Sequence, residues 1–175
     1  ALGQLFDAID DADGDSLLAV TADHGEEFGE HGAYSHHSKL YDELINVPLI
    51  LEFPQKIDGD LTRPISLLDI TPTLLGTIGV DTDEHRGQDL LADGEGREHV
   101  LSETNPDGGV SVCARGETDK CIVTPSGTEY YDLNRDEKEI IDRCQECPDR
   151  CEKLREMILD HIRKYQIEGG DKLAK

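Results

Sequence analysis

The stretch LLAVTADHGEEFGEHGAYSHHSKLYDELINVPLILEFP (residues 17–54) contains two apolar runs separated by a polar segment rich in histidine, acidic residues and glycine. The continuous apolar run at 16–22 predicts a strand that is buried on both faces, as in a parallel sheet. The run at 47–53 predicts a second buried strand. Between them, residues 25–38 contain three glycines and little periodicity, so we expect a loop there, followed by a short helix at 39–44.

Asp23 and His24 lie where the first predicted strand ends, and ligands in open α/β sheets bind beyond the carboxyl ends of strands. Neighbouring strand residues point to opposite faces, so both side chains can reach one ion only if the chain turns there, and Gly25 permits such a turn. A carboxylate and an imidazole suit Mn²⁺, Zn²⁺ or iron, whereas Ca²⁺ prefers oxygen ligands throughout. The sequence therefore predicts a metal site. The alternatives are that Asp23 caps the following turn and that His24 is an interior histidine.

Other polar residues of this segment have structural interpretations beside chemical ones. We expect His31 to bond its neighbours and hold the shape of the loop, and Lys39 to pair with Asp42 rather than with a substrate anion. Arg115, from a later segment, is a candidate to approach the site. We expect Glu26, Glu27 and Glu30 to lie on a solvated face. The alternative for Glu26 is that it orients a metal ligand.

The second half of the sequence has a different pattern. Residues 66–79 predict a helix that Thr71 caps and Pro72 begins. From about residue 98, four short β-like runs are separated by turns containing Pro, Gly or Asp, which predicts a small antiparallel sheet. Residues 134–165 look mostly helical, with an apolar stripe at Leu154, Met157, Ile158, His161 and Ile162. We expect Pro148 to divide this region into two helices.

The expected fold class is α/β, in two parts. Residues 1–97 are expected to form a mixed, mostly parallel sheet flanked by helices. Residues 98–175 are expected to form a small antiparallel β subdomain with C-terminal helices.

The chain is strongly acidic, with 39 Asp and Glu residues against 17 Lys and Arg residues and a net charge of −22. Such a surface repels nucleic acid and anionic membranes, so neither is an expected partner. Self-repulsion of this size is best tolerated at high salt, where the Debye length falls to about 3 Å. No apolar run approaches the ~18 residues of a membrane span. The charge predicts a halophilic protein that is intracellular or at the cell surface, with the cytoplasm as the expected location.

Five cysteines cannot all pair within one chain. Cys144, Cys147 and Cys151 have spacings that suit one face of a helix, while Cys113 and Cys121 lie upstream. Free or structural thiols are the favoured interpretation, and a disulfide or a three-cysteine zinc site are the alternatives.

Several ordered motifs resemble one protein family. The stretch at 17–54 closely resembles the second half of the catalytic domain of sulfatases, within the alkaline-phosphatase-like superfamily. ISLLDITPTLLGTIGV (65–80), GQDLL (87–91) and CARGETDKCIVTPSGTEYYDLNRDEKE (113–139) resemble the next helix, the following turn and the C-terminal sheet of that family. The resemblance covers roughly residues 1–142.

This resemblance implies a hydrolase in which a nucleophile, often a formylglycine made within a C/S-x-P-x-R motif, attacks sulfur or phosphorus. A divalent cation (Ca²⁺, Mg²⁺, Mn²⁺ or Zn²⁺) holds the nucleophile and the oxygens of the anion. Asp23 and His24 match the late pair of metal ligands, and the mixed pair favours Mn²⁺ or Zn²⁺. His36, with His37 one step away, matches a catalytic residue that contacts the transferring group or the leaving oxygen. A solvated loop is the alternative for these two histidines.

The sequence also departs from the family pattern. It contains no C/S-x-P-x-R motif and no counterpart of the early Asp pair. We therefore expect the C-terminal half of the catalytic region, without the nucleophile. Such a half-domain exposes strand edges, so we expect homo-oligomers or pairing with a partner strand.

The expected function is metal-dependent hydrolysis of sulfate esters, of the arylsulfatase type, on a small anionic ester substrate. His24 stands where many sulfatases have asparagine. It favours a phosphodiesterase, phosphonate-ester hydrolase or phosphoglycerol transferase as the alternative. A third interpretation is a non-catalytic acidic scaffold or binding module.

Overall fold

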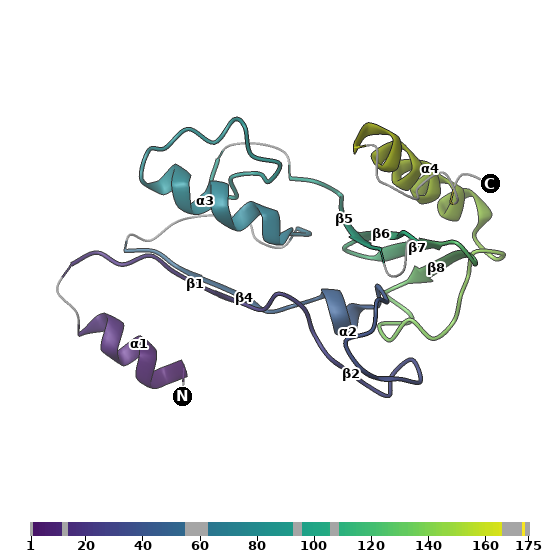
Figure 1. Ribbon diagram of the computed structural model, residues 1–175, viewed down its shortest axis with the longest axis horizontal. Coiled ribbons are helices and arrows are strands. Elements are labelled where there is room, and N and C mark those ends of the chain that lie inside the picture. Colours follow the sequence, from purple (N-terminus) through teal and green to yellow (C-terminus); the bar gives the residue numbers. More distant parts are fainter. Residues whose placement is uncertain are drawn as a thin grey trace.

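The computed structural model describes residues 2–11, 14–54, 63–92, 96–105, 109–165 and 173. Figure 1 shows a C-terminal unit, in which a four-stranded sheet lies under a long helix, and an N-terminal region that extends away from it. The elements in chain order are α1 (Leu2–Asp10), β1 (Leu18–Thr21), β2 (Glu27–Phe28), β3 (Tyr34–Ser35), α2 (Asp42–Ile45), β4 (Leu49–Glu52), η1 (Leu67–Asp69), α3 (Ile70–Thr77), β5 (His99–Thr104), β6 (Ser111–Gly116), β7 (Asp119–Thr124), β8 (Gly127–Asp132) and α4 (Pro148–Tyr165).

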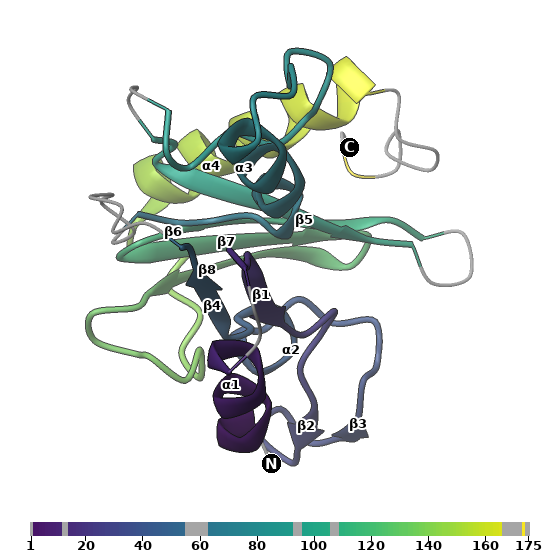
Figure 2. The same ribbon diagram turned by 90° about the vertical axis from the view of Figure 1, so that its left-hand side faces the viewer.

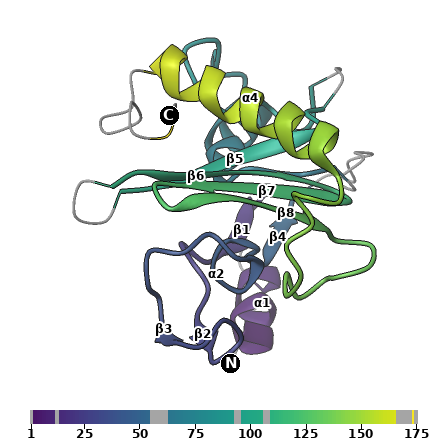
Figure 3. The same cartoon turned by 90° about the vertical axis from the view of Figure 1, so that its right-hand side faces the viewer.

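The predicted small antiparallel sheet is confirmed, because β5, β6, β7 and β8 pair in chain order and each pair is antiparallel. Side chains alternate between its two faces. One face joins a core with the buried side of α4: Val112, Ala114, Cys121, Val123, Tyr130, Leu154, Ile158 and Ile162. The other face joins Leu40, which precedes α2, to a second core: Cys113, Ile122 and Tyr131. Figures 2 and 3 show α3 and α4 on one side of the sheet and β1, β4 and α2 on the other.

The expectation of two helices divided by Pro148 is wrong. Residues 134–147 form turns and irregular structure, and a single helix, α4, begins at Pro148. Proline suits a first helical position, because its fixed φ is helical and its missing N–H would have no partner there. The predicted apolar stripe is present, since Leu154, Ile158 and Ile162 recur every fourth residue and are buried.

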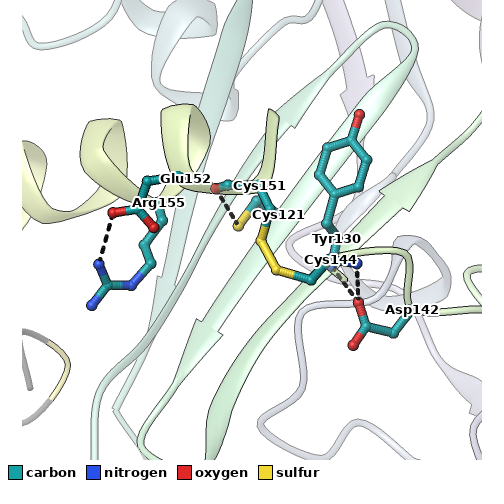
Figure 4. Close-up of a disulfide and its surroundings, with 7 residues drawn as sticks. All are labelled: Cys121, Tyr130, Asp142, Cys144, Cys151, Glu152 and Arg155. Carbon is teal, nitrogen blue, oxygen red and sulfur yellow. Dashed lines mark hydrogen bonds and ion pairs between the residues drawn. A yellow bond between two sulfur atoms is a disulfide. The ribbon is translucent and has the colours of Figure 1, made fainter. Parts of the chain in front are cut away.

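A disulfide joins Cys144, in the turn before α4, to Cys151 in the first turns of that helix (Figure 4). Asp142 supports the turn, because its Oδ1 accepts hydrogen bonds from the backbone N–H groups of Tyr130 and Cys144. Three thiols remain free: Cys113, Cys121 and Cys147. Burial raises the pKa of the Cys113 thiol to about 11 and that of Cys121 to about 12, which keeps both protonated and unreactive. Disulfides are typical of oxidising compartments, and the cytoplasmic location stays a prediction.

The expected mostly parallel sheet is not confirmed. Strands β1 and β4 pair with each other antiparallel, with Leu18 opposite Glu52 and Thr21 opposite Leu49, and no two described strands run parallel. The chain between them carries one helix, α2, of four residues. A parallel connection needs a crossover of a dozen or more residues, usually a longer helix. The side chains of both strands are partly or fully exposed rather than buried on both faces.

The helix predicted at 66–79 is present as η1 and α3, but its cap differs from the expectation. Ser66, not Thr71, caps the start, and Ser66 and Asp69 form a reciprocal capping box. The Asp69 carboxylate is buried and binds the guanidinium of Arg97 with contacts of 2.6 and 2.8 Å. None of the helices in the described part of the chain is both long and apolar enough to span a membrane.

Candidate functional site

The predicted site lies on the connection between β1 and β4. Asp23 and His24 follow β1 directly, and the chain then forms a small hairpin in which Glu27 pairs with Ser35 and Phe28 with Tyr34. The expected loop at 25–38 therefore contains two very short strands. The hairpin returns the chain to His36, beside the end of β1.

Gly25 fixes the path of the chain after His24. Its backbone N–H donates a 2.8 Å hydrogen bond to the carbonyl oxygen of Leu44 in α2. A β-carbon at position 25 would overlap with the carbonyl oxygen of Glu43. Glycine is therefore needed because two backbone segments approach each other closely.

Replacing Gly25 with alanine is expected to lower the free energy of unfolding by about 2–3 kcal/mol, because the new methyl group forces two backbone segments apart. Urea denaturation measures this change. The matched control is Gly3→Ala in α1, where an added β-carbon meets open space and alanine favours a helix by up to about 1 kcal/mol. Equal stability of the two variants would contradict the prediction.

The potential donor atoms of Asp23 and His24 lie near each other at the end of β1. The Nδ1 of His24 lies 2.8 Å from the carbonyl oxygen of Gly25. A carbonyl oxygen can only accept, so Nδ1 carries the proton and Nε2 keeps a free lone pair. Nε2 is 3.9 Å from Oδ2 of Asp23. Two metal–ligand bonds of about 2.1 Å reach across this separation only with an angle at the ion wider than tetrahedral, so the two side chains would have to move closer to share an ion. The side chains are 47% and 91% exposed for His24 and Asp23, so neither is an interior residue.

His36 lies beside this pair. Its ring centroid is 4.6 Å from that of His24, with the ring planes inclined by 33°. Its Nδ1 is 3.4 Å from a carboxylate oxygen of Glu26, so Glu26 contacts the predicted catalytic histidine rather than either predicted metal ligand. His37 is exposed, and its side chain contacts none of these residues in the described structure. Three of the four predicted site residues therefore come together, with Glu26 as a fourth member.

The residues present fit part of a metal site. Within the described residues there is no group of three or more His, Cys, Asp or Glu side chains placed to hold an ion. Asp23 and His24 supply two donors, and metal sites of the zinc type have three or four protein ligands. A cation held here would need donors from beyond these residues.

Asp23 and His24 also line a cavity of about 560 Å³, hereafter the Asp23–His24 cavity. Much of its lining is apolar, from α2, β4 and the residues around them: Leu40, Leu44, Ile45, Val47, Leu49 and Leu51. Arg115, expected to approach the site, lines the same cavity. Its guanidinium donates to Asp42 at 3.0 Å and to the carbonyl oxygen of Gly116 at 2.8 Å.

A second finding corrects the expectations for Glu27 and Lys39. The side chain of Glu27 is fully buried instead of lying on a solvated face. Lys39 pairs with Glu27, its Nζ lying 2.9 and 3.0 Å from the two carboxylate oxygens, and not with Asp42. A buried carboxylate requires such a partner, and the loop folds around this pair. Lys39 outweighs the effect of burial and lowers the pKa of Glu27.

His31 holds the loop to the C-terminal unit, which confirms its expected structural role. Its Nδ1 lies 2.6 Å from a carboxylate oxygen of Glu43 and its Nε2 lies 3.0 Å from the carbonyl oxygen of Glu139. Its ring stacks on that of Tyr41, with centroids 3.6 Å apart. Burial by itself lowers the pKa of His31, but the hydrogen bonds to Glu139 and Glu43 outweigh burial and raise it.

Lys120 is a residue that sequence reasoning missed. Its side chain is fully buried, and its Nζ lies 2.8 Å from Oδ1 of Asp42 and 2.6 Å from Oε1 of Glu139. The other oxygen of Glu139 accepts a 2.6 Å hydrogen bond from the backbone N–H of Asp42. This cluster anchors the first residue of α2 on β7. The signal in the sequence was a lysine inside an apolar strand pattern, which requires a buried acidic partner.

The fold is a mixed α/β arrangement in which Asp23, His24 and His36 lie together after β1. The family model described as "Sulfatase" matches residues 1–80. The sulfatase YidJ of Escherichia coli is 28% identical over 93 residues, which are 52% of this chain and 19% of that protein. The ulvan-active sulfatase of Formosa agariphila is 36% identical over 76 residues, which are 41% of this chain and 13% of that protein. The resemblance to the sulfatase family, a class of sulfuric ester hydrolases, is confirmed.

Solved structures agree at the level of the fold. An enzyme solved with its substrate D-glucosamine-2-N,6-O-disulfate superimposes with a TM-score of 0.76 at 20% identity, over 94% of this chain and 38% of that chain. A 2-O GAG sulfatase superimposes with a TM-score of 0.73 at 24% identity, over 86% of this chain and 36% of that chain. The chain therefore has a sulfatase fold and spans well under half the length of the proteins it matches.

Proposed function

We propose that this chain is the metal-binding C-terminal part of a sulfate ester hydrolase, in which Asp23 and His24 hold a divalent cation. The observation that carries the proposal is the 3.9 Å separation of Asp23 Oδ2 and His24 Nε2, both exposed at the end of β1. The hydrogen bond from Nδ1 to a backbone carbonyl is the arrangement in which metal-bound histidines are usually held.

The side chains around the pair have distinct roles in this proposal. The cation would stabilise negative charge on the oxygens of the ester group. His36, whose ring lies beside that of His24, is the proposed proton donor to the leaving oxygen, since a ring N–H of imidazole can act as a general acid. Glu26 orients His36 through its 3.4 Å contact with Nδ1. His36 is preferred to His37 because its ring lies against the metal-ligand pair.

The remaining metal ligands and the nucleophile belong, in this proposal, to another part of the same enzyme. The match covers 13% to 19% of the curated relatives quoted above, which leaves room for such a part. Strand β1 pairs only with β4 among the described strands, so its other edge is open. We propose that a parallel strand of the remaining domain pairs there, and that the chain divides into parts at 1–97 and 98–175.

A sulfated carbohydrate is the proposed substrate. Relatives named for ulvan, for hexuronate 2-O-sulfate and for glucosamine disulfate support it. Aryl sulfates serve as reporter substrates for the same chemistry. Phosphate esters form the second candidate class, because His24 provides a nitrogen donor where a hydrolase for sulfate commonly has an amide.

The test is a comparison of kcat/KM for a matched pair of esters, 4-nitrophenyl sulfate and bis-4-nitrophenyl phosphate, with the enzyme that contains this chain. We expect the sulfate to be preferred at least about tenfold, a difference of about 1.4 kcal/mol in transition-state binding. A chelator is expected to abolish turnover and Mn²⁺ to restore it. Preference for the phosphate ester would assign the second class, and no turnover of either ester would assign a non-catalytic module.

A further inference from the structure

A second cavity of about 670 Å³ lies where the residues before η1, the segment leading into β5, the β6–β7 turn and the start of α4 meet. Four cationic side chains line it, hereafter the cationic cavity: Arg63, Arg97, Arg150 and Lys153. The whole chain has 17 basic residues against 39 acidic ones. Three acidic residues also line it, so its balance of charge is much less acidic than that of the chain as a whole.

Part of this charge is already neutralised inside the protein. Arg97 binds the buried carboxylate of Asp69 at 2.6 and 2.8 Å. Among the acidic lining residues, Asp119 accepts a hydrogen bond of 3.0 Å from Nε2 of His99. Two other acidic lining residues are exposed: Glu98 and Glu117.

Arg150 and Lys153 are the cations closest to being available to a ligand, although Arg150 also interacts with the Tyr130 hydroxyl and both lie near Asp119. They lie three residues apart in the first turns of α4, so they are neighbours on the helix surface. Both are exposed, and in the described part of the chain neither has an ion pair with a carboxylate. A guanidinium and an ammonium group at this spacing can together bind the oxygens of one sulfate or carboxylate group.

The two cavities adjoin each other. Arg63, Pro64 and Glu117 line both the cationic cavity and the Asp23–His24 cavity. One extended ligand can therefore place an ester group near Asp23 and a second group beside Arg150.

We propose that the cationic cavity binds a second anionic group, a sulfate or a carboxylate, of the sugar ester whose first sulfate reaches Asp23 and His24. This inference rests on the proposed function and adds a specificity site to it. The net charge of −22 repels a polyanion at long range, but salt screens that repulsion beyond about 8 Å at physiological ionic strength. Direct contacts inside a cavity are screened much less. Arg150 and Lys153 therefore select substrates that carry more than one anionic group.

The experiment measures binding by isothermal titration calorimetry, using the enzyme that contains this chain. The probes are a disulfated disaccharide, its monosulfated counterpart and sodium sulfate. The test variant is Arg150→Gln/Lys153→Gln. The matched control is Arg163→Gln/Lys164→Gln, which removes the same charge from the exposed last turn of α4. All four residues are exposed, so both variants are expected to fold, and turnover of 4-nitrophenyl sulfate is measured alongside.

We expect the disulfated sugar to bind at least about tenfold more tightly than the monosulfated one, the ratio that one charge-assisted hydrogen bond provides. The Arg150/Lys153 variant is expected to bind the disulfated and monosulfated sugars with equal affinity and to keep its turnover of the aryl sulfate. The control variant is expected to keep both.

Three results would overturn the inference: no preference for the disulfated sugar, an unchanged preference in the test variant, or an equal loss in the control. Weakened binding of sodium sulfate without a preference for the disulfated sugar would identify a site for the free anion and overturn the link to substrate. Absence of aryl sulfate turnover in the unaltered enzyme would instead count against the proposed function.

Discussion

Replacing Asp23 with asparagine in the enzyme that contains this chain is expected to abolish cation binding and ester hydrolysis together. Asparagine keeps the shape of the side chain but removes the negative charge, and the other predicted metal ligand among the described residues is a single His24 nitrogen. Residues that merely orient metal ligands change affinity about 10–100-fold, so loss of a ligand is expected to weaken Mn²⁺ binding by at least about 100-fold. Loss of the charge stabilisation lowers kcat by about a thousandfold.

Competition titration of Mn²⁺ against a chromophoric chelator measures the affinity, and turnover of an aryl sulfate measures the activity. The matched control is Asp15→Asn, the same change at an exposed residue ahead of β1. The control is expected to bind Mn²⁺ and turn over as the unaltered enzyme does. If Asp23→Asn retained both properties, the pair at the end of β1 would not be a metal site.

Replacing Lys120 with methionine is expected to lower the free energy of unfolding by about 3–5 kcal/mol, as is typical when one partner of a buried ion pair is removed. Methionine fills a similar volume, but it leaves the carboxylates of Asp42 and Glu139 without their shared cation. Asp42 retains Arg115 at 3.0 Å, whereas Glu139 retains no cation partner among the described residues. The cost therefore falls mainly on Glu139, which is 1% exposed.

Urea denaturation measures the change, with Lys164→Met as the control. Lys164 lies on the exposed last turn of α4, where a lysine contributes little to stability. We expect Lys120→Met also to weaken Mn²⁺ binding, because Asp42 begins α2 and α2 holds Gly25 next to His24. A loss of less than about 1 kcal/mol would show that the cluster does not anchor the loop.

The local pattern of the sequence predicted most of the elements. Strands β1 and β4 and the four strands β5–β8 lie where periodicity and turn residues placed them. These features depend on contacts between near neighbours in the chain, so a local pattern is sufficient. The same reasoning predicted that Asp23 and His24 would be adjacent at the end of a strand.

Expectations that depended on partners distant in the chain were less successful. The antiparallel pairing of β1 with β4 required knowing which strands become neighbours. The burial of Glu27 depended on Lys39, which sits 12 residues away, and the position of Lys120 depended on Asp42, which sits 78 residues away. The single helix after Pro148 was misjudged because a proline that interrupts a helix and one that begins it have the same local pattern.

The sequence by itself determined the motif at the end of β1, the meander of β5–β8 and the amphipathic face of α4, because each is encoded in residues a few positions apart. Only the tertiary structure decided that His36, and not His37, lies against His24, and that a buried lysine on β7 holds the loop carrying them. The physical reason is that the charge of a buried group must be balanced by whatever side chain the fold brings to it. That choice is made across the whole chain, so a local pattern such as the lysine within β7 indicates a buried charge but not which side chains balance it.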